Sequence, residues 1–407
     1  MASKKAPSPV GNMLIAQSGG PTAVINQSLV GAVLEAKAVP AIRRIFGARH
    51  GIEGILREDF INLRRESKAT LERVATTPSA ALGSVRKKPT PEDCARLFEV
   101  MQRHDIRYFF YIGGNDSAET AHIVSEEAKA SDYDLRCYHI PKTIDNDLRE
   151  NDHTPGFGSA ARFVAMAFAG DNLDSRSLPG VKINVVMGRH AGFLTAASAL
   201  GRRFPDDGPH LIYLPERPFN MDRFVRDVKA TVRRLGRCVV AASEGIVDKS
   251  GTPIAAGYTQ EVCSHGNVQL SGTGALGDML AGLIKAKTDA TRVRADTFGY
   301  LQRSFPDVVS ETDAREAFAV GRHGVRFAAA GQRAGSVAIV RKKGARYAVE
   351  YRCVPLKNVA RDTRHMPAAF INAAGNDVTK AFVDYAAPLV GRLPRIGRLK
   401  GKPVPAS

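Results

Sequence analysis

The sequence predicts an α/β fold with a mostly parallel sheet. Two observations predict it: apolar runs alternate with helix-like stretches, and the main apolar runs end in Gly-rich or carboxylate-rich clusters. Strands that alternate with helices are typical of a parallel sheet, because a parallel connection needs a crossover, usually a helix. The chain of 407 residues, at about 150 residues per domain, indicates two domains or three.

The main apolar runs predict buried strands. These runs are Met13–Ala16, Arg107–Ile112, Leu135–Ile140, Lys182–Met187 and Arg237–Ala242. A helix is expected after the first run, where Ile25, Leu29 and Val33 recur at helical spacing. Weaker patterns near the end of the chain predict a helix at 312–320, strands at 335–340 and 348–354, and a last helix at 378–390.

Composition and charge exclude several classes of protein. The net charge is +17, but Lys and Arg are scattered in pairs, which favours a solvated surface over a nucleic-acid site. No apolar run approaches the ~18–20 residues of a membrane span. The Lys- and Pro-rich residues 1–10 lack an apolar signal core and are expected to be disordered. The five cysteines form no Cys-x-x-Cys pair, which argues against disulfides or a zinc site and favours a reducing cytoplasm.

Two Gly-rich turns predict anion sites, because ligands of parallel sheets bind at the carboxyl ends of the strands. Ser18-Gly19-Gly20-Pro21-Thr22 precedes a helix, and its glycines allow backbone N–H groups to approach an anion. Gly113-Gly114-Asn115-Asp116-Ser117 is similar, but the charge of Asp116 requires a metal or a lysine beside a phosphate. The alternatives are a tight strand–helix turn for the first cluster and a helix cap for the second.

The stretch Thr143-Ile144-Asp145-Asn146-Asp147 carries the strongest chemical signal. If it is extended, Thr143, Asp145 and Asp147 share one face beside Lys142. Two carboxylates and a cation at a strand end suit a general base and a metal ligand. The alternative is a structural polar network.

Arginines in separate segments suit phosphate capture, because the guanidinium fork donates two hydrogen bonds. Arg189 follows an expected strand, and Arg294 and Arg303 flank Phe298-Gly299-Tyr300-Leu301-Gln302. His190 is interpreted as a packing or network histidine. Gly272–Gly277 matches GxGxxG, but only a short apolar run precedes it, so helix packing is preferred over a dinucleotide site.

Together these clusters resemble the phosphofructokinase family, and more closely its pyrophosphate-dependent branch. The motifs that carry the resemblance, over about residues 12–320, are SGGPTAVIN, LGSVR, IGGND, PKTIDNDL, MGRHAGFL, SEG and FGYLQRS. The resemblance implies two Rossmann-like three-layer domains with mostly parallel sheets and an active site in the cleft between them. It places a phosphoryl-donor domain at 11–155 plus about 300–350, and a sugar-phosphate domain at 156–299 plus the C-terminal segment to 407.

The resemblance also implies roles for individual residues. The catalytic residues are Asp145 as the base, Lys142, Asp116 and Arg189. The sugar-phosphate contacts are Thr143, Ile144, Asp145, Met187, Gly188, Arg189 and Glu244, and the 6-phosphate clamp is Arg294, Tyr300 and Arg303. Gly19, Gly20 and Arg86 face pyrophosphate, and Asn115 and Asp147 hold Mg²⁺.

The implied reaction is reversible phosphoryl transfer from pyrophosphate to the 1-hydroxyl of fructose 6-phosphate in the cytoplasm, by a homo-oligomer, most simply a homodimer, with a shared active site. No nucleic acid or membrane partner is expected. The sequence departs from the family at three places: Asn115-Asp116 replaces Asp-Gly, Tyr300 replaces a common His, and Lys182 stands near the position of the cross-subunit Arg. The alternatives are an ATP-dependent 6-phosphofructokinase and an inactive, anion-binding regulatory protein.

Overall fold

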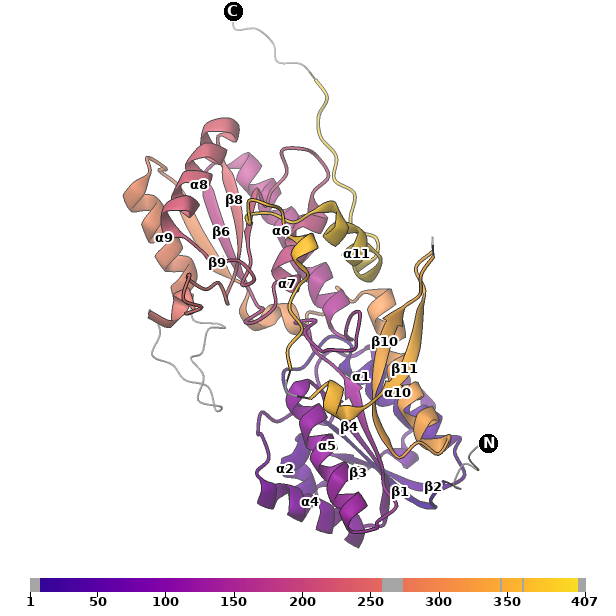
Figure 1. The fold of residues 1–407 in the computed structure, drawn as a ribbon. Helices are drawn as coiled ribbons and strands as arrows, with labels where there is room; N and C mark the ends of the chain where they lie inside the picture. The colour runs from indigo at the N-terminus through magenta and orange to yellow at the C-terminus, as the bar shows by residue number, and fades with distance from the viewer. Residues whose placement is uncertain (1–7, 258–273, 345, 361, 402–407) are drawn as a thin grey trace, which may run out of the picture.

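The computed structural model describes residues 8–257, 274–344, 346–360 and 362–401 as two α/β bodies, one above the other in Figure 1. The larger sheet has seven strands, in the order β11 (Val349–Val354), β10 (Ala334–Arg341), β5 (Arg136–Pro141), β4 (Ile106–Gly113), β1 (Gly11–Gln17), β2 (Ile42–Ala48) and β3 (Phe60–Asn62). The smaller sheet has four strands, in the order β7 (Leu211–Tyr213), β8 (Cys238–Ser243), β6 (Val181–Val186) and β9 (Val293–Thr297).

Both sheets are mostly parallel, which confirms the predicted fold class. Every pairing in the smaller sheet is parallel. In the larger sheet only the two edge pairings, β10 with β11 and β2 with β3, are antiparallel. The strands predicted from apolar runs lie within β1, β4, β5, β6 and β8, apart from one or two terminal residues, whereas the sequence patterns missed β2, β3, β7 and β9.

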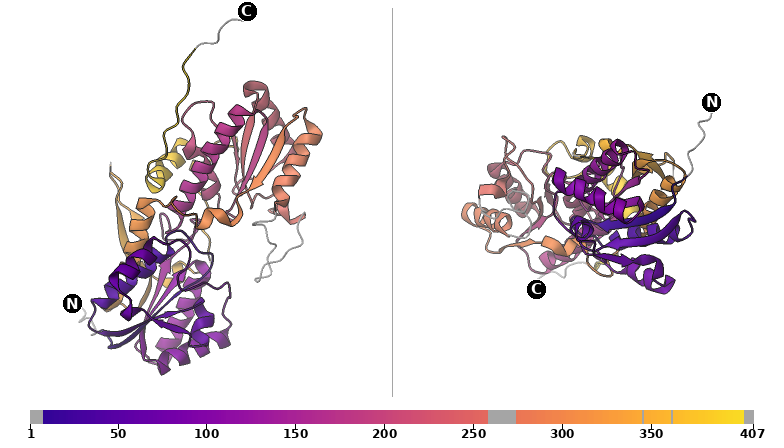
Figure 2. Two further views of the ribbon diagram at one scale, coloured as in Figure 1. Left: turned by 180° about the vertical axis from the view of Figure 1, so that it is seen from behind. Right: turned by 90° about the horizontal axis from the view of Figure 1, so that it is seen from below.

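Helices cover both faces of each sheet (Figures 1 and 2). The larger sheet carries α1 (Ile25–Lys37), α3 (Lys68–Thr76) and α10 (Glu311–Ala329) on one face, and α2 (Gly51–Leu56), α4 (Pro91–Arg103) and α5 (Asn115–Ala130) on the other. The smaller sheet carries α6 (Phe157–Ser177), α7 (Phe193–Ala196) and α11 (Lys380–Val390) on one face, and α8 (Met221–Leu235) and α9 (Ala275–Lys287) on the other.

Alternate residues of β1 explain why the core strands are continuous apolar runs. Met13 and Ile15 pack under α1 and α10, while Leu14 and Ala16 pack under α2 and α4. A strand that is covered on both faces needs apolar residues at every position. Such a strand is therefore recognised in the sequence by the length of its apolar run, because apolar and polar residues do not alternate along it.

The structure also bears on two other predictions from the sequence, the disordered N-terminal segment and the GxGxxG match. Ser8 Oγ donates to Ala329 O, and Pro9 O accepts from Tyr108 Oη, so ordered contacts begin inside the segment that was expected to be disordered. Part of the GxGxxG match, Gly272 and its neighbour at 273, lies outside the described residues. A Cβ on Gly277 would lie 3.2 Å from Ala295 Cβ, a close packing of α9 on β9.

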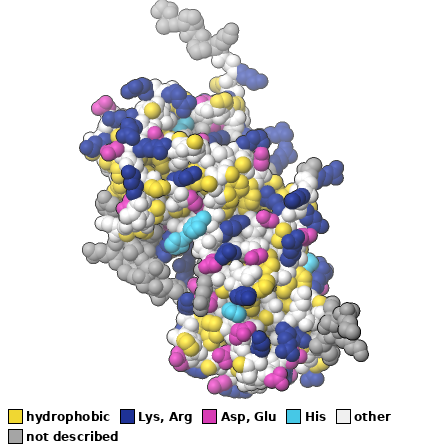
Figure 3. Space-filling model, in the orientation of Figure 1, with side chains coloured by type: hydrophobic (Ala, Val, Ile, Leu, Met, Phe, Trp, Pro, Cys, Tyr) yellow, Lys and Arg dark blue, Asp and Glu magenta, His cyan; other side chains and the backbone are white. Residues whose placement is uncertain are grey.

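On the face drawn in Figure 3, Lys and Arg side chains are spread over both bodies, with Asp and Glu side chains among them. Among the helices of the described residues, none has the length and the low charge that a bilayer crossing requires.

The two long helices α1 and α10 cross at glycines. A Cβ on Gly321 would lie 2.0 Å from Ser28 O, and a Cβ on Gly31 would lie 2.1 Å from Phe318 O. Ser28 Oγ also donates to Ala317 O at 2.9 Å. The backbones therefore touch, and the crossing fixes α10 against the N-terminal half of the larger sheet.

We predict that Gly321→Ala lowers the free energy of unfolding by at least about 2 kcal/mol, because the new methyl group must separate two backbones. The matched control is Gly282→Ala in α9, where nothing lies within 4 Å of the added Cβ. That change should raise stability by about 0.5–1 kcal/mol, as alanine is the better helix former. Urea denaturation of both variants measures the difference. Equal effects of the two substitutions would contradict the close crossing.

Candidate active site

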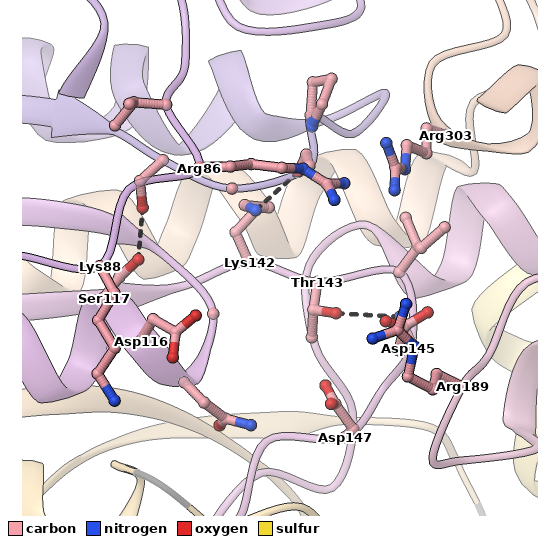
Figure 4. Close-up of a pocket in the computed structure, with 18 of the residues that line it drawn as sticks. Arg86, Lys88, Asp116, Ser117, Lys142, Thr143, Asp145, Asp147, Arg189 and Arg303 are labelled. Carbon is pink, nitrogen blue, oxygen red and sulfur yellow. Dashed lines mark hydrogen bonds between the residues drawn. The ribbon is translucent and has the colours of Figure 1, made fainter. Parts of the chain in front are cut away.

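A cavity of about 540 Å³ lies between the two bodies, where strands from both sheets end. Its lining includes most residues that the sequence assigned to the site: Gly19, Gly20, Arg86, Asn115, Asp116, Lys142, Thr143, Ile144, Asp145, Asp147, Met187, Arg189, Glu244, Tyr300 and Arg303. Loops after β1, β4 and β5 supply one wall, and loops after β6 and β8 supply the other. Figure 4 shows the charged members of this set facing one another.

Three cations surround the Gly-rich loop after β1. Lys142 Nζ donates to Gly20 O at 2.7 Å (Figure 4). A Cβ on Gly20 would lie 3.2 Å from the guanidinium carbon of Arg303 and 3.3 Å from a terminal nitrogen of Arg86. The loop therefore brings backbone and three positive side chains together, as an anionic ligand requires.

Arg303 lies beside Gly20, on the side of the cavity where the resemblance places the phosphoryl donor. The resemblance assigns Arg303 to the 6-phosphate clamp, yet its guanidinium touches Gly20 and stacks over the Tyr300 ring at 4.5 Å. The 3-10 helix η4 (Gly299–Arg303) carries both residues, and both line the cavity. Arg303 can therefore contact a ligand in the cavity beside Gly20.

Lys142 is buried, with 3% of its surface exposed. Burial, with the charges of Arg303 and Arg86, lowers the pKa of Lys142 to about 7, although Asp145 and Asp147 oppose the shift. A lysine of this pKa is only about half protonated at neutral pH. An incoming polyanion would restore its charge.

The catalytic loop, residues 143–154, includes the stretch 143–147, whose side chains would share one face if the stretch were extended. That condition is not met, because Asn146 has φ of 61°, a left-handed conformation. Thr143, Asp145 and Asp147 nevertheless all line the cavity (Figure 4). Thr143 Oγ1 accepts from Asp145 N at 3.1 Å, which closes a tight turn around Ile144.

Asp145 and Asp147 lie close together in the cavity, and each is partly buried. Burial raises the pKa of Asp145, whereas Arg303, Lys142, His190 and Arg189 lower it. Burial and the neighbouring Asp145 raise the pKa of Asp147 to about 7. Carboxylates with raised pKa values in a cavity are candidates for proton transfer.

The loop after β6 holds Arg189 through a close backbone contact. A Cβ on Gly245 would lie 2.0 Å from Arg189 O, and Gly188 has φ of 131°. Ser243 Oγ donates to Gly188 O at 2.7 Å. The glycines of the Met187-Gly188-Arg189 and Ser243-Glu244-Gly245 segments are therefore needed for this approach.

Arg294 lies outside the lining of this chain's cavity, contrary to the sequence expectation. It stands on β9 opposite Lys182 on β6 in the parallel register, and its guanidinium donates to Val293 O at 3.0 Å. Lys182 pairs with Asp296 and lies 3.8 Å from Asp171. The reason is geometric: Arg294 is an early residue of β9, and the cavity lies beyond the other end of the strands.

The alternative role of Asp116 as a helix cap is wrong. The N-cap of α5 is Gly114, and no side chain hydrogen-bonds to it. Ser117 Oγ instead pairs closely with Ser18 Oγ across the cavity floor (Figure 4). Asp116 instead lines the cavity, where its negative charge would act on a bound ligand.

The sequence analysis missed part of the lining. Lys87, Lys88, Glu119 and Thr120 line the end of the cavity beside Asp116, and Lys88 pairs with Glu119 at 2.9 Å. The signal that could have identified Lys87 and Lys88 is their position directly after Arg86 in the sequence. His190, which was assigned to packing, and Thr363 also line the cavity.

The chemistry of the predicted metal ligands fits a hard divalent cation. Asn115 Oδ1 is buried and has no hydrogen-bond partner, and burial disfavours the charge of Asp147. Within the described residues no group of three or more His, Cys, Asp or Glu side chains could hold a metal. Mg²⁺ suits such a sparse site, because it keeps water and substrate oxygens as ligands.

Comparison with known proteins agrees with the resemblance to the phosphofructokinase family. The phosphofructokinase family profile matches residues 12–327. The chain is 59% identical over 393 residues to pyrophosphate--fructose 6-phosphate 1-phosphotransferase of Rhodospirillum rubrum, covering 96% of this chain and 97% of the relative. The enzyme of the same name from Xanthomonas campestris is 42% identical, with 93% and 91% covered.

A similar structure has also been solved. The crystal structure of pyrophosphate-dependent phosphofructokinase from Marinobacter aquaeolei superposes with a TM-score of 0.84, at 35% identity and 98% coverage of both chains. The likeness therefore extends over both bodies and not only over the motifs.

We predict that Lys142 titrates near neutral pH in the free protein, because burial and two arginines lower its pKa to about 7. Arg303→Met removes the second-largest cause and should raise that pKa, and Arg86→Met should raise it less. NMR titration of the lysine side-chain carbons measures both shifts. A Lys142 pKa near the ordinary value of about 10.4 in the unaltered protein would contradict the buried cationic cluster.

Proposed function

The chain belongs to the phosphofructokinase family, and we propose that it transfers a phosphoryl group from pyrophosphate to the 1-hydroxyl of fructose 6-phosphate. The products are fructose 1,6-bisphosphate and phosphate, and the reaction is reversible, which suits both glycolysis and gluconeogenesis. The observation that carries the proposal is the cluster of Lys142, Arg86 and Arg303 around Gly20, with Asp145 across the cavity. The relatives' names supply the substrates.

Asp145 takes the proton of the sugar hydroxyl. Burial raises the pKa of this carboxyl and makes it a stronger base, while Arg189 and Lys142 keep its charged form accessible. Thr143 Oγ1 accepts from Asp145 N and fixes the backbone that carries the carboxylate. Met187, Gly188, Arg189 and Glu244, with Thr143 and Ile144, contact the sugar phosphate, and Tyr300 offers its hydroxyl to the 6-phosphate.

Lys142, Arg86 and Arg303 stabilise the charge that develops on the transferred and leaving oxygens. Phosphoryl transfer depends on positioning and on such fixed cations more than on covalent chemistry. Gly19 and Gly20 leave the backbone open to pyrophosphate, since a side chain on Gly19 would meet Lys142 Nζ at 3.0 Å. Pyrophosphate in turn supports the charge of Lys142.

Asp116 favours pyrophosphate over ATP as the donor. The α-phosphate of a nucleotide would continue past the transferred group toward Asp116, which lines that end of the cavity. Asp116 is exposed, so solvent screens its charge, and a second negative charge about 4 Å away would be repelled by about 1 kcal/mol. Pyrophosphate ends before that point.

Asn115 and Asp147 would hold Mg²⁺. The cation would supply positive charge that offsets part of the negative charge of the phosphates. The unpartnered Asn115 Oδ1 supports this assignment. A cation would also favour the ionised form of Asp147.

The active enzyme is proposed to be a cytoplasmic homodimer that completes each site with the partner's residues. Arg294 and Lys182 are cross-strand neighbours away from this chain's cavity, as residues lent to a second copy would be. The four described cysteines, which form no disulfide, support a reducing compartment. An inactive regulatory protein is disfavoured by the intact Asp145 and Arg189.

We predict turnover of fructose 6-phosphate with pyrophosphate and little with ATP. In the double variant Asp116→Gly, Lys142→Gly, relief of the repulsion should allow measurable ATP use, and loss of Lys142 should cut the pyrophosphate rate by at least about 10²-fold. Product formation with each donor is the measurement, and the Asp116→Gly single variant is the control that separates the two effects. An unchanged donor ratio in the double variant would falsify the role of Asp116.

We predict that two inactive variants restore activity when mixed. Asp145→Asn lacks the base and should lose about 10²–10⁴-fold in rate, and Arg294→Met should be similarly weak. After the two are unfolded together and refolded at equal amounts, half of the dimers are mixed and each has one complete site, so activity should reach about a quarter of the wild type. Refolding each variant alone is the control. No recovery in the mixture would show that each site uses its own Arg294.

A further inference from the structure

Residues 363–366, the bridging segment, connect the two walls of the cavity. After η5 (Leu356–Asn358) beside α5, the chain runs from the lower body to η6 (Ala368–Phe370) against the upper body (Figure 1). Thr363 lines the cavity and forms an isolated bridge with Leu148. The bridging segment lies beyond residue 327, where the family profile ends.

Arg364 binds the backbone of the catalytic loop. Its guanidinium donates to Asn146 O at 2.6 and 3.2 Å, to Asn151 O at 2.6 Å and to Asp152 O at 2.8 Å. Its backbone N donates to Asp147 O at 2.7 Å. One side chain thus ties together both ends of the loop that carries Asp145 and Asp147. Only arginine has enough donors in a rigid fork for this.

Tyr385 of α11 makes a second tie to the same loop. Asn146 Nδ2 donates to Tyr385 Oη at 2.7 Å, and Tyr385 Oη donates to Asp152 O at 2.6 Å. Asn146 is fully buried, and its Oδ1 accepts from Thr154 N at 3.1 Å. The left-handed Asn146, a strained conformation, is therefore held on its carbonyl by Arg364 and on its side chain by Tyr385.

The other end of the bridging segment holds the loop of Arg189. His365 Nδ1 lies 2.8 Å from His190 O. Glu216 Oε1 accepts from Met366 N at 3.1 Å and from Gly192 N at 2.8 Å. The segment therefore fixes the loop of the base relative to the loop that binds the sugar.

We propose that Arg364 is a positioning residue for phosphoryl transfer. It holds the catalytic loop, through its carbonyls, at the distance from Arg189 at which the carboxylate of Asp145 meets the sugar hydroxyl. This inference rests on the proposed function. A misplacement of about 1 Å of a reacting group can cost about 10²-fold in rate, so loss of Arg364 lowers kcat and leaves pyrophosphate binding unchanged.

The test compares Arg364→Met and Arg364→Lys with the unaltered enzyme. Both substitutions keep the backbone contact to Asp147 O. We expect kcat to fall by about 10- to 100-fold in Arg364→Met, with the KM for pyrophosphate unchanged within about twofold, because Gly19, Gly20 and Arg86 keep their places. Arg364→Lys should resemble Arg364→Met, since one ammonium cannot span three carbonyls.

Two further variants complete the experiment. Tyr385→Phe keeps the packed ring and removes only the hydroxyl, so it should fold and lower kcat by about 3- to 10-fold. The matched control is Arg162→Met: Arg162 of α6 also donates to backbone carbonyls of the C-terminal segment, at Val390 and Arg392, away from the catalytic loop. It should lower thermal stability and leave kcat within about twofold.

The outcomes separate this inference from the proposed function. No turnover of the unaltered enzyme with pyrophosphate would overturn the proposed function itself. An active enzyme whose Arg364→Met variant keeps its kcat, or loses it only in parallel with Arg162→Met, would overturn the positioning role. If Arg364→Met does not fold, an unchanged kcat in Tyr385→Phe would overturn the positioning role instead. Faster amide exchange of Thr154 in Arg364→Met than in Arg162→Met supports it independently of rate.

Discussion

The enclosure of two partly buried carboxylates in one cavity is the constraint on which the rest of the site depends. Asp145 raises the pKa of Asp147, so the charged forms of both carboxylates need compensating cations nearby. Arg303, Lys142, His190 and Arg189 lower the pKa of Asp145 against its burial, and they come from three segments: η4, the end of β5 and the loop after β6. The cost of the carboxylates is thus offset by cations that also line the cavity. Arg303, together with Arg86, lowers the pKa of Lys142, so the charges of the cavity are held in a balance that an anionic ligand would shift.

This balance requires the two bodies to meet at the carboxyl ends of their strands. The larger sheet supplies Gly20, Asp116 and the catalytic loop, while the smaller sheet supplies Arg189 and Glu244. Both sheets are parallel around the cavity, so their loops collect at one edge. Backbone approaches at Gly188 and Gly245 leave no room for a Cβ, so close main-chain contacts fix the backbone of Arg189.

Features encoded locally could be predicted from the sequence. Apolar runs identified β1, β4, β5, β6 and β8, and the glycines and carboxylates after them identified most of the lining. Features that depend on distant residues could not be predicted. The left-handed Asn146 is stabilised by Arg364 and Tyr385, more than two hundred positions away. The position of Arg303 beside Gly20 depends on how η4 meets the other body. Short strands such as β3 and β7 form only because a neighbouring strand pairs with them.

The bonding of Arg364 also has an electrostatic consequence. Its partners are carbonyls of Asn146, Asn151 and Asp152, which carry dipoles but no net charge. A carboxylate partner would have cancelled the guanidinium charge, whereas carbonyls orient the side chain and leave its field acting on the loop. That field lowers the pKa of Asp147 against burial and the adjacent Asp145. The hydrogen bonds of Arg364 therefore hold the backbone of the catalytic loop, while its charge favours the ionised form of Asp147 against the opposing effects of burial and Asp145.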